Sequence, residues 1–284
     1  MTLVEILILV AVAPFLTGIG AVYFANGKRK PRKPSVLLFH SISTCQQAHF
    51  SHYSPEKFVQ VIGELARFPL CSRTLSEAAG NAHGPADFAI TFDDGFESFY
   101  SSAFPALEAN GMKVTVFPIA GYIGKLSLWD ILPPQPHLNK EQIREISDHG
   151  HEIGSHTLTH ANLPFLSDAD IVRELADSKH LIEDITGKPV TSLSFPYGSW
   201  NKRVWEKAKE IGYQRGTCYR HHNKIIEGLV PVHGVYSFDT IQDVIDKATS
   251  KSSSLNTYAR SRVMSHFAKG TPLWKFQSNY ALFR

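Results

Sequence analysis

The chain has 284 residues, of which 43% are hydrophobic and 19% charged, and it shows no internal repeat or low-complexity block. It can bury a sizeable core, and about 250 residues is typical of one barrel domain. The net charge of +3 is concentrated near the amino terminus, which argues against a basic groove for nucleic acid or a channel for acidic substrates.

Within residues 1–25, the run Leu3–Tyr23 is nearly continuous apolar sequence, interrupted by Glu5, Pro14 and Thr17. About 20 such residues span a bilayer, so this segment is predicted to be a transmembrane anchor. A secretory signal peptide would open with basic residues, whereas here they follow the apolar run, in a basic linker over residues 26–35. The positive-inside rule then favours a single-pass membrane protein with the next domain on the cytoplasmic side. The alternative is an exported domain whose basic cluster contacts anionic headgroups.

After the linker, apolar strand candidates alternate with helices, which is typical of a parallel α/β barrel. Seven strands are expected: Val36–Phe39, Phe88–Phe92, Lys113–Pro118, Glu152–Ser155, Val190–Pro196, Tyr213–Cys218 and Leu229–Tyr236. Ser54 and Ser167 are predicted helix caps, and Gly187 is predicted to close the helix that Ser167 begins. The expected fold is an α/β class, distorted (β/α) barrel over residues 36–240, followed by a helical extension over residues 241–284.

A pair of aspartates follows one predicted strand. Asp93 and Asp94 stand in the run from Thr91 to Gly95, whose glycine marks the turn after the strand. Strand ends are where α/β sheets and barrels place their chemistry. At such a turn both carboxylates can reach one cavity, one as metal ligand and the other as general base. Asp-Asp-Gly is also an ordinary turn sequence, so the pair alone is weak evidence.

A pair of histidines follows another predicted strand. His156 and His160 stand in the run GSHTLTH at residues 154–160. On a helical turn, their i, i+4 spacing would bring both imidazoles to one side, as in other zinc sites with a three-residue gap. In a chain of 14 histidines the pair alone proves little. Together with Asp93 and Asp94, it predicts the site of a metal-assisted hydrolase.

These two motifs and a third, SFPYG at residues 194–198, resemble the motifs of the NodB-type polysaccharide deacetylases of carbohydrate esterase family 4. The similarity covers most of the chain after the linker. It implies a NodB-type barrel, in which Asp93 is the catalytic base. It also implies that Asp94, His156 and His160 bind the metal.

The third motif implies that the backbone amide of Tyr197 helps to hold the oxyanion, and that Pro196 and Tyr197 contact the substrate. Trp129 stands in a loop, residues 124–130, that resembles one in a branch of the family. Its ring is a candidate platform for a sugar, because an aromatic face suits the apolar face of a pyranose. For Trp129 and Trp200 alike, a buried packing role is the alternative.

Two departures from the family pattern stand out. The family often has an arginine that orients the catalytic aspartate where this chain has Ser194, which leaves the orientation of Asp93 open. The family's Leu-x-x-His motif normally lies near the carboxyl end and carries the general acid, whereas here residues 37–40 precede the first motif. This order is similar to that of the permuted deacetylases of secreted poly-N-acetylglucosamine. His40 is therefore the candidate acid, with His233 in reserve, and a merely solvated histidine is the alternative for His40.

The resemblance implies a metal-dependent hydrolase that removes N-acetyl groups from an amino-sugar glycan or glycolipid, and the predicted anchor places this enzyme at a membrane. Zn²⁺ suits the ligand set of two nitrogens and one carboxylate, although similar sites accept other divalent metals. Rival enzyme interpretations keep the site but change the substrate, to a lipid-linked sugar with a formyl or acetyl amide or to a small non-sugar amide. A non-catalytic glycan-binding domain is the other alternative. The presence of both Asp93 and Asp94 argues against it, because a binder needs no base. The expected partners are the glycan or glycolipid substrate and, through the anchor, a membrane; no nucleic-acid partner is expected, and the sequence does not identify protein partners.

Overall fold

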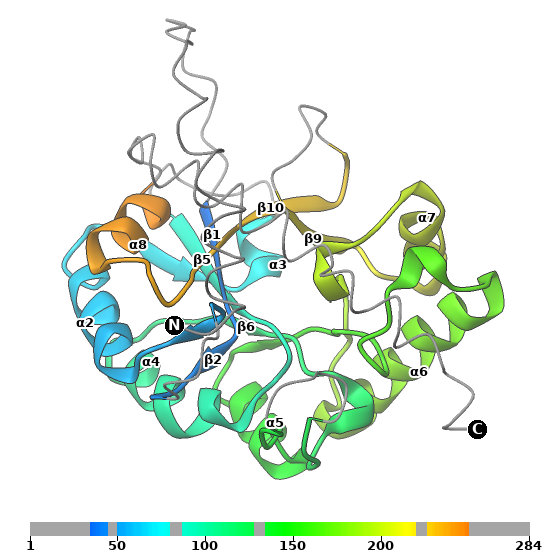
Figure 1. The fold of residues 1–284 in the computed structure, drawn as a ribbon, viewed down its shortest axis with the longest axis horizontal. Coiled ribbons are helices and arrows are strands. Elements are labelled where there is room, and N and C mark those ends of the chain that lie inside the picture. The colour runs from blue at the N-terminus through cyan, green and yellow to red at the C-terminus, as the bar shows by residue number, and fades with distance from the viewer. Residues whose placement is uncertain (1–34, 45–49, 80–86, 128–133, 220–225, 250–284) are drawn as a thin grey trace, which may run out of the picture. The chain divides into compact units, whose positions relative to one another are not determined.

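The computed structural model describes residues 35–44, 50–79, 87–127, 134–219 and 226–249, and it contains a barrel of parallel strands (Figure 1). Along the barrel the strands lie in the order β7-β6-β5-β1-β10-β9-β8, with parallel pairing throughout. They are β1 (Ser35–Phe39), β5 (Asp87–Phe92), β6 (Thr115–Val116), β7 (Glu152–Ile153), β8 (Ser192–Ser194), β9 (Arg215–Tyr219) and β10 (Leu229–Gly234). A parallel bridge between Ser155 and Leu193 joins the two ends of this order, so the barrel is nearly closed.

Helices connect the strands and surround the barrel (Figure 1). They are α2 (Pro55–Leu65), α4 (Phe104–Ala109), α5 (Lys140–Asp148), α6 (Asp168–Thr186), α7 (Lys202–Ile211) and α8 (Ile241–Ala248). The predicted caps are confirmed: the side chains of Ser54 and Ser167 each accept a backbone hydrogen bond in the first turn, of α2 and α6 respectively. Gly187 ends α6 in a left-handed conformation, φ 65°, which glycine adopts without a steric cost.

Three further strands lie outside this order. The short strand β4 (Cys71–Arg73) pairs with the beginning of β5, while β2 (Ser41–Ile42) and β3 (His52–Tyr53) form a separate pair just after β1. Between β4 and β5, the short helix α3 (Leu75–Ala78) covers the amino end of the barrel, where the amide of Ser76 donates to Glu152 at 2.8 Å. Because α3 covers the amino end of the barrel, a functional site is expected at the carboxyl end.

The core has two parts because alternate strand residues face opposite sides. On β5, Phe88, Ile90 and Phe92 belong to the larger cluster, which fills the space between strands and helices. Ala89 belongs to the smaller cluster inside the barrel, together with Leu38 of β1 and residues of α3.

The predicted barrel of about seven strands is confirmed, with several strands shorter than expected. The predicted anchor over residues 1–25 and nearly all of the basic linker lie outside the described residues. Where the structure is described, no helix combines the length and apolar character needed to cross a bilayer. A helix begins at Ile241, as predicted, but the extension past residue 249 also falls outside the described part of the chain.

Candidate active site

The predicted site residues lie at the carboxyl ends of the strands. His40 follows β1 and Asp93 follows β5, and the preceding residues, Phe39 and Phe92, are paired neighbours in the two strands. The amide of Asp93 donates to the carbonyl of Phe39 at 3.0 Å, which extends the pairing by one more residue. The histidine that follows the first strand in the chain is thus placed next to the aspartate pair.

Three predicted metal ligands converge. The Oδ1 atom of Asp94 lies 3.3 Å from Nε2 of His156 and 3.5 Å from Nε2 of His160. One ligand atom from each of these three side chains lies within 4.8 Å of the other two, so the three could hold a metal ion. Two ligand atoms at about 2.1 Å from a tetrahedral ion lie about 3.4 Å apart, which matches these distances. Asp94 Oδ1 is buried without a hydrogen-bond partner, so a cation would satisfy it.

Hydrogen bonding and charge prepare these ligands for a cation. Nδ1–H of His156 donates to the carbonyl of Ser194 at 2.9 Å, which leaves the Nε2 lone pair for a metal. Burial alone would raise the pKa of Asp94, but the contact with His156 and the charges of His160 and His40 hold it well below its usual range. Burial lowers the pKa of His160 to about 3. Burial favours a low pKa for His156, but the charges of Asp93 and Asp94 and the contact with Asp94 raise it above its usual value. A metal ion would therefore bind a carboxylate and one neutral imidazole directly, and would compete with a proton for His156.

The loop that carries the two histidines is not a helical turn, and this part of the prediction is wrong. The i, i+4 pair does come together, with ring centroids 5.0 Å apart. However, residues 156–160 form no helix, and Thr157 and His160 have positive φ angles, 67° and 62°. The left-handed region is unfavourable for both residues, so surrounding contacts must hold the loop.

Glu174 of α6 supplies those contacts. This carboxylate is 3% exposed, and it accepts hydrogen bonds from the amides of Leu158 at 3.0 Å and Thr159 at 2.9 Å, and from the Thr159 hydroxyl at 2.6 Å. Glu174 belongs to none of the sequence motifs and was not predicted. Its position in the sequence could have suggested a role, because Glu174 lies on the otherwise apolar face of its helix, where a charged residue is rarely buried without a partner.

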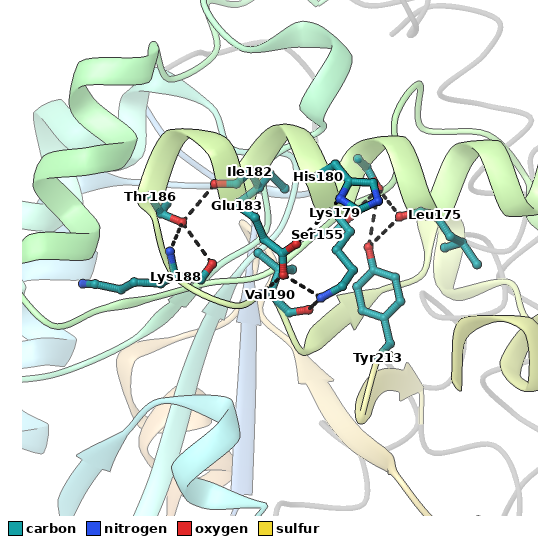
Figure 2. A network of polar contacts seen from close by, with 11 residues as sticks. Ser155, Leu175, Lys179, His180, Ile182, Glu183, Thr186, Lys188, Val190 and Tyr213 are labelled. Carbon is teal, nitrogen blue, oxygen red and sulfur yellow. Dashed lines mark hydrogen bonds and ion pairs between the residues drawn. The ribbon is translucent and has the colours of Figure 1, made fainter. Parts of the chain in front are cut away.

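A second set of contacts fixes α6 against the strand end that precedes the loop. Ser155 donates to the hydroxyl of Ser178. The hydroxyl of Tyr213 donates to the carbonyl of Leu175 at 3.0 Å (Figure 2). Further along the helix, Lys179 bridges Glu183 and the carbonyl of Val190 in the same figure. The helix is therefore tied at several points to the strand ends that bear the ligands.

Backbone strain is concentrated in the site. Among the described residues, Asp94, Thr157, His160 and Tyr197 are the non-glycine residues with positive φ. All four belong to the three motifs read from the sequence. Such conformations cost about 1–3 kcal/mol each and persist where the surrounding structure determines them. Their coincidence with the ligands supports a functional site here.

Asp93 is buried at 5% exposure, and its two oxygens differ. Oδ2 accepts a hydrogen bond from the hydroxyl of Ser194 at 2.8 Å, whereas Oδ1 has no hydrogen-bond partner. Burial raises the pKa of Asp93, against the opposing charges of His156 and His40. A desolvated carboxylate with one open oxygen next to a metal site has the character of a general base.

The third motif forms a short turn, Pro196–Gly198, directly after β8. Pro196 is buried, and Tyr197 has a φ of 59° with its ring 4.6 Å from that of His160. The motif thus lies against the ligand set, while the predicted roles of Tyr197 and Pro196 toward substrate stay predictions. Trp129 lies outside the described residues. Trp200 is partly buried against Phe195, in agreement with the packing alternative.

The two candidate acids are placed differently. The side chains of Val230 and Val232 in β10 belong to the cluster inside the barrel, so alternation turns His233, between Val232 and Gly234, to the other face. The charge of His40, by contrast, acts on both aspartates. The geometry therefore favours His40 over His233.

His137 is a second residue at the site that was not predicted. This buried side chain lies within hydrogen-bond distance of the Asp94 carbonyl, with Nδ1 at 2.9 Å, and its ring packs against Phe96 and Tyr122. It supports the left-handed backbone of Asp94 from the loop that follows residue 133. Nothing in the sequence around His137 distinguished it from the other histidines.

Comparisons with known proteins agree with this geometry. Residues 80–216 match the family model described as polysaccharide deacetylase. YxkH of Bacillus subtilis (strain 168), a protein named for the same family, is 32% identical over 189 residues, which is 66% of this chain and 64% of the relative. The peptidoglycan-N-acetylglucosamine deacetylase of Bacillus cereus is 32% identical over 127 residues, covering 44% of this chain and 53% of the relative. The chain thus spans less than two thirds of either relative.

Solved structures share the fold. The Streptococcus pyogenes deacetylase PplD, solved with acetate, superposes with a TM-score of 0.68 at 20% identity, over 77% of this chain and 99% of that one. IcaB from Ammonifex degensii gives a TM-score of 0.65 at 23% identity, over 76% and 97% of the two chains.

The barrel brings two aspartates and two histidines together at its carboxyl end, and three of them form a group that could hold a metal ion, as in metal-dependent hydrolases. Residues 80–216 thus belong to a polysaccharide deacetylase domain of the NodB type.

Proposed function

We propose that this protein is a metal-dependent deacetylase that hydrolyses the N-acetyl groups of an amino-sugar polysaccharide or glycolipid. The observation that supports this most is the pairing of a three-ligand site, Asp94, His156 and His160, with a separate buried carboxylate, Asp93. The name of the Bacillus cereus relative supports amino sugars as the substrate class. Two nitrogens and one carboxylate suit Zn²⁺.

The chain's own residues supply most of the steps. A bound divalent ion would polarise the amide carbonyl and acidify water. The open Oδ1 of Asp93 removes a proton from the attacking water, and the amide of Tyr197 helps to hold the oxyanion of the tetrahedral intermediate. His40 donates a proton to the departing nitrogen, because an amine leaves poorly without one.

Hydrolysis assays with the full chain test this proposal. Purified protein in detergent is incubated with acetylated amino-sugar oligomers, with and without a chelator, and the released acetate is measured. We expect chelator-sensitive release, and Asp93→Asn protein serves as the matched inactive control. Binding of oligomers without any acetate release would instead support a glycan-binding domain. Hydrolysis of only formylated or non-sugar amides would show that the substrate is not an acetylated amino sugar.

We also propose that residues 1–25 anchor the enzyme in a membrane, with the catalytic domain on the cytoplasmic side. The support is the apolar amino terminus and the basic residues that follow it. Fractionation of cells followed by protease treatment of intact spheroplasts tests both points. Recovery in the soluble fraction would contradict the anchor, and digestion from outside would place the domain on the exported side.

A further inference from the structure

Ser194, the last residue of β8, contacts both halves of the site. Its hydroxyl donates to Oδ2 of Asp93 at 2.8 Å, and its backbone carbonyl accepts the Nδ1–H of His156 at 2.9 Å. The residue is 1% exposed, so water does not compete for these bonds. The side chain of Ser194 thus serves the base, while its backbone serves a metal ligand.

A second hydroxyl lies behind the first. Ser194 is paired with Thr217 of β9, and the Thr217 hydroxyl donates to the hydroxyl oxygen of Ser194 at 2.9 Å. Thr217 is 3% exposed. An ionised carboxylate only accepts hydrogen bonds, so the one proton of the Ser194 hydroxyl must point to Asp93. The Ser194 oxygen is then left to accept from Thr217, which fixes the direction of the whole chain of bonds.

The contact between Ser194 and Asp93 crosses the inside of the barrel. Asp93 follows β5 and Ser194 ends β8, and these strands are not neighbours in the sheet. The Ser194 side chain has only one atom beyond Cβ, its Oγ, and this atom already lies 2.8 Å from Oδ2 of Asp93. An arginine at position 194 is several atoms longer, so it would extend past the contact that the serine makes.

We propose that Thr217 and Ser194 form a neutral hydroxyl relay that positions the base, in place of a charged partner. With Oδ2 held, rotation of the carboxylate is blocked and Oδ1, which has no partner, is the oxygen that faces the reacting water. Thr217 acts only through Ser194, because its hydroxyl bonds to Ser194 and not to the carboxylate. This inference rests on the proposed function, since it assigns Asp93 as the base.

The experiment compares variants of the full chain in acetate release from one oligomer, with kcat and KM determined separately. Ser194→Ala should lower kcat about 10–100-fold, because a misplaced catalytic group costs on the order of 10²-fold. KM should change little, and Zn²⁺ affinity should stay unchanged, because the carbonyl that holds His156 is still present. Ser194→Thr keeps the hydroxyl and should restore most of the rate. Ser194→Arg should not.

Thr217 provides the sharper test. Thr217→Val should lower kcat less than Ser194→Ala does, and the double variant should be no slower than Ser194→Ala alone. Ser192→Ala is the matched control, since Ser192 is a buried hydroxyl of the same strand that bonds to Glu152 at the other end of the barrel. Its kcat should match that of the unmodified protein. Thermal melting of each variant separates loss of folding from loss of rate.

Several outcomes would overturn the relay. They are an unchanged kcat in Ser194→Ala, additive losses in the double variant, or loss of Zn²⁺ affinity in Ser194→Ala. An active unmodified protein with an equally active Ser194→Ala variant would refute the relay and leave the proposed function standing. An unmodified protein that binds Zn²⁺ but releases no acetate from any amide would overturn both.

Discussion

Glu174 is expected to control metal affinity although it does not touch the metal. Its carboxylate accepts two backbone amides and one hydroxyl from Leu158 and Thr159, between the two histidine ligands. The loop it holds contains left-handed backbone at Thr157 and His160. Without Glu174, the loop can relax toward ordinary backbone angles, and the imidazoles will no longer be held in place for a cation.

The expected loss of stability follows mainly from the two backbone amides that Glu174 accepts. Glu174→Ala leaves two amides without their partner, at about 1–3 kcal/mol each. Water can reach part of this loop, because Leu158 and Thr159 are half-buried, so we expect a loss of about 2–3 kcal/mol in stability. Metal affinity should fall about 10–100-fold, the usual effect of removing a residue that orients ligands. Glu174→Gln keeps an acceptor but not the charge, and should lie between.

Titration with Zn²⁺ in competition with a chromophoric chelator measures the affinity, and denaturant unfolding of the metal-free protein measures the stability. Asp177→Asn is the matched control, because Asp177 lies on the exposed side of the same helix, and it should change neither quantity. If Glu174→Ala bound Zn²⁺ as tightly as the unmodified protein, the loop would be held by other contacts and this reasoning would fail.

Three further predictions concern the base, the acid and the response to pH. Asp93→Asn should keep Zn²⁺ but lose about 10²–10⁴-fold in kcat, whereas Asp94→Asn should weaken Zn²⁺ binding itself; equally poor binding in both variants would refute the division of roles. His40→Ala should slow amide hydrolysis strongly and spare activated acetyl esters, whose leaving groups need little protonation, and equal losses on both would make His40 structural. In the buried side chain of His151, Nδ1 accepts the amide of Val114, and burial holds the pKa at about 4. The unfolded chain takes up that proton near 6.5, so denaturant melts should lose about 3 kcal/mol as pH falls from 6.5 to 4, and His151→Gln should remove this part of the slope.

The residues that carry the chemistry could be predicted because their types are rare in combination. A paired carboxylate after one strand and two histidines after another identified four positions that the structure brings together. The barrel followed from the alternation of apolar strands with helices. What the sequence could not provide was the backbone conformation of the histidine loop. Spacing alone does not distinguish a helical turn from a loop held in left-handed angles by a distant glutamate.

The supporting residues were missed for a related reason. Glu174, His137 and Thr217 reach the site from elements that carry none of the motifs, and each acts through a hydrogen bond to another residue. A helix glutamate, a loop histidine and a strand threonine have ordinary roles in most proteins. Their function depends on which strands become neighbours, and that is a property of the whole barrel rather than of any local segment.

The position of His40 shows how a barrel tolerates a change in the order of its motifs. Chain order places His40 before every other motif, yet β1 lies between β5 and β10 in the middle of the strand order. Parallel strands all present their carboxyl ends at the same edge. A residue at a strand end therefore reaches the site whichever strand is first in the chain, provided that its strand has the right neighbours. Since Phe39 pairs with Phe92, the next residues, His40 and Asp93, meet as a candidate acid and base.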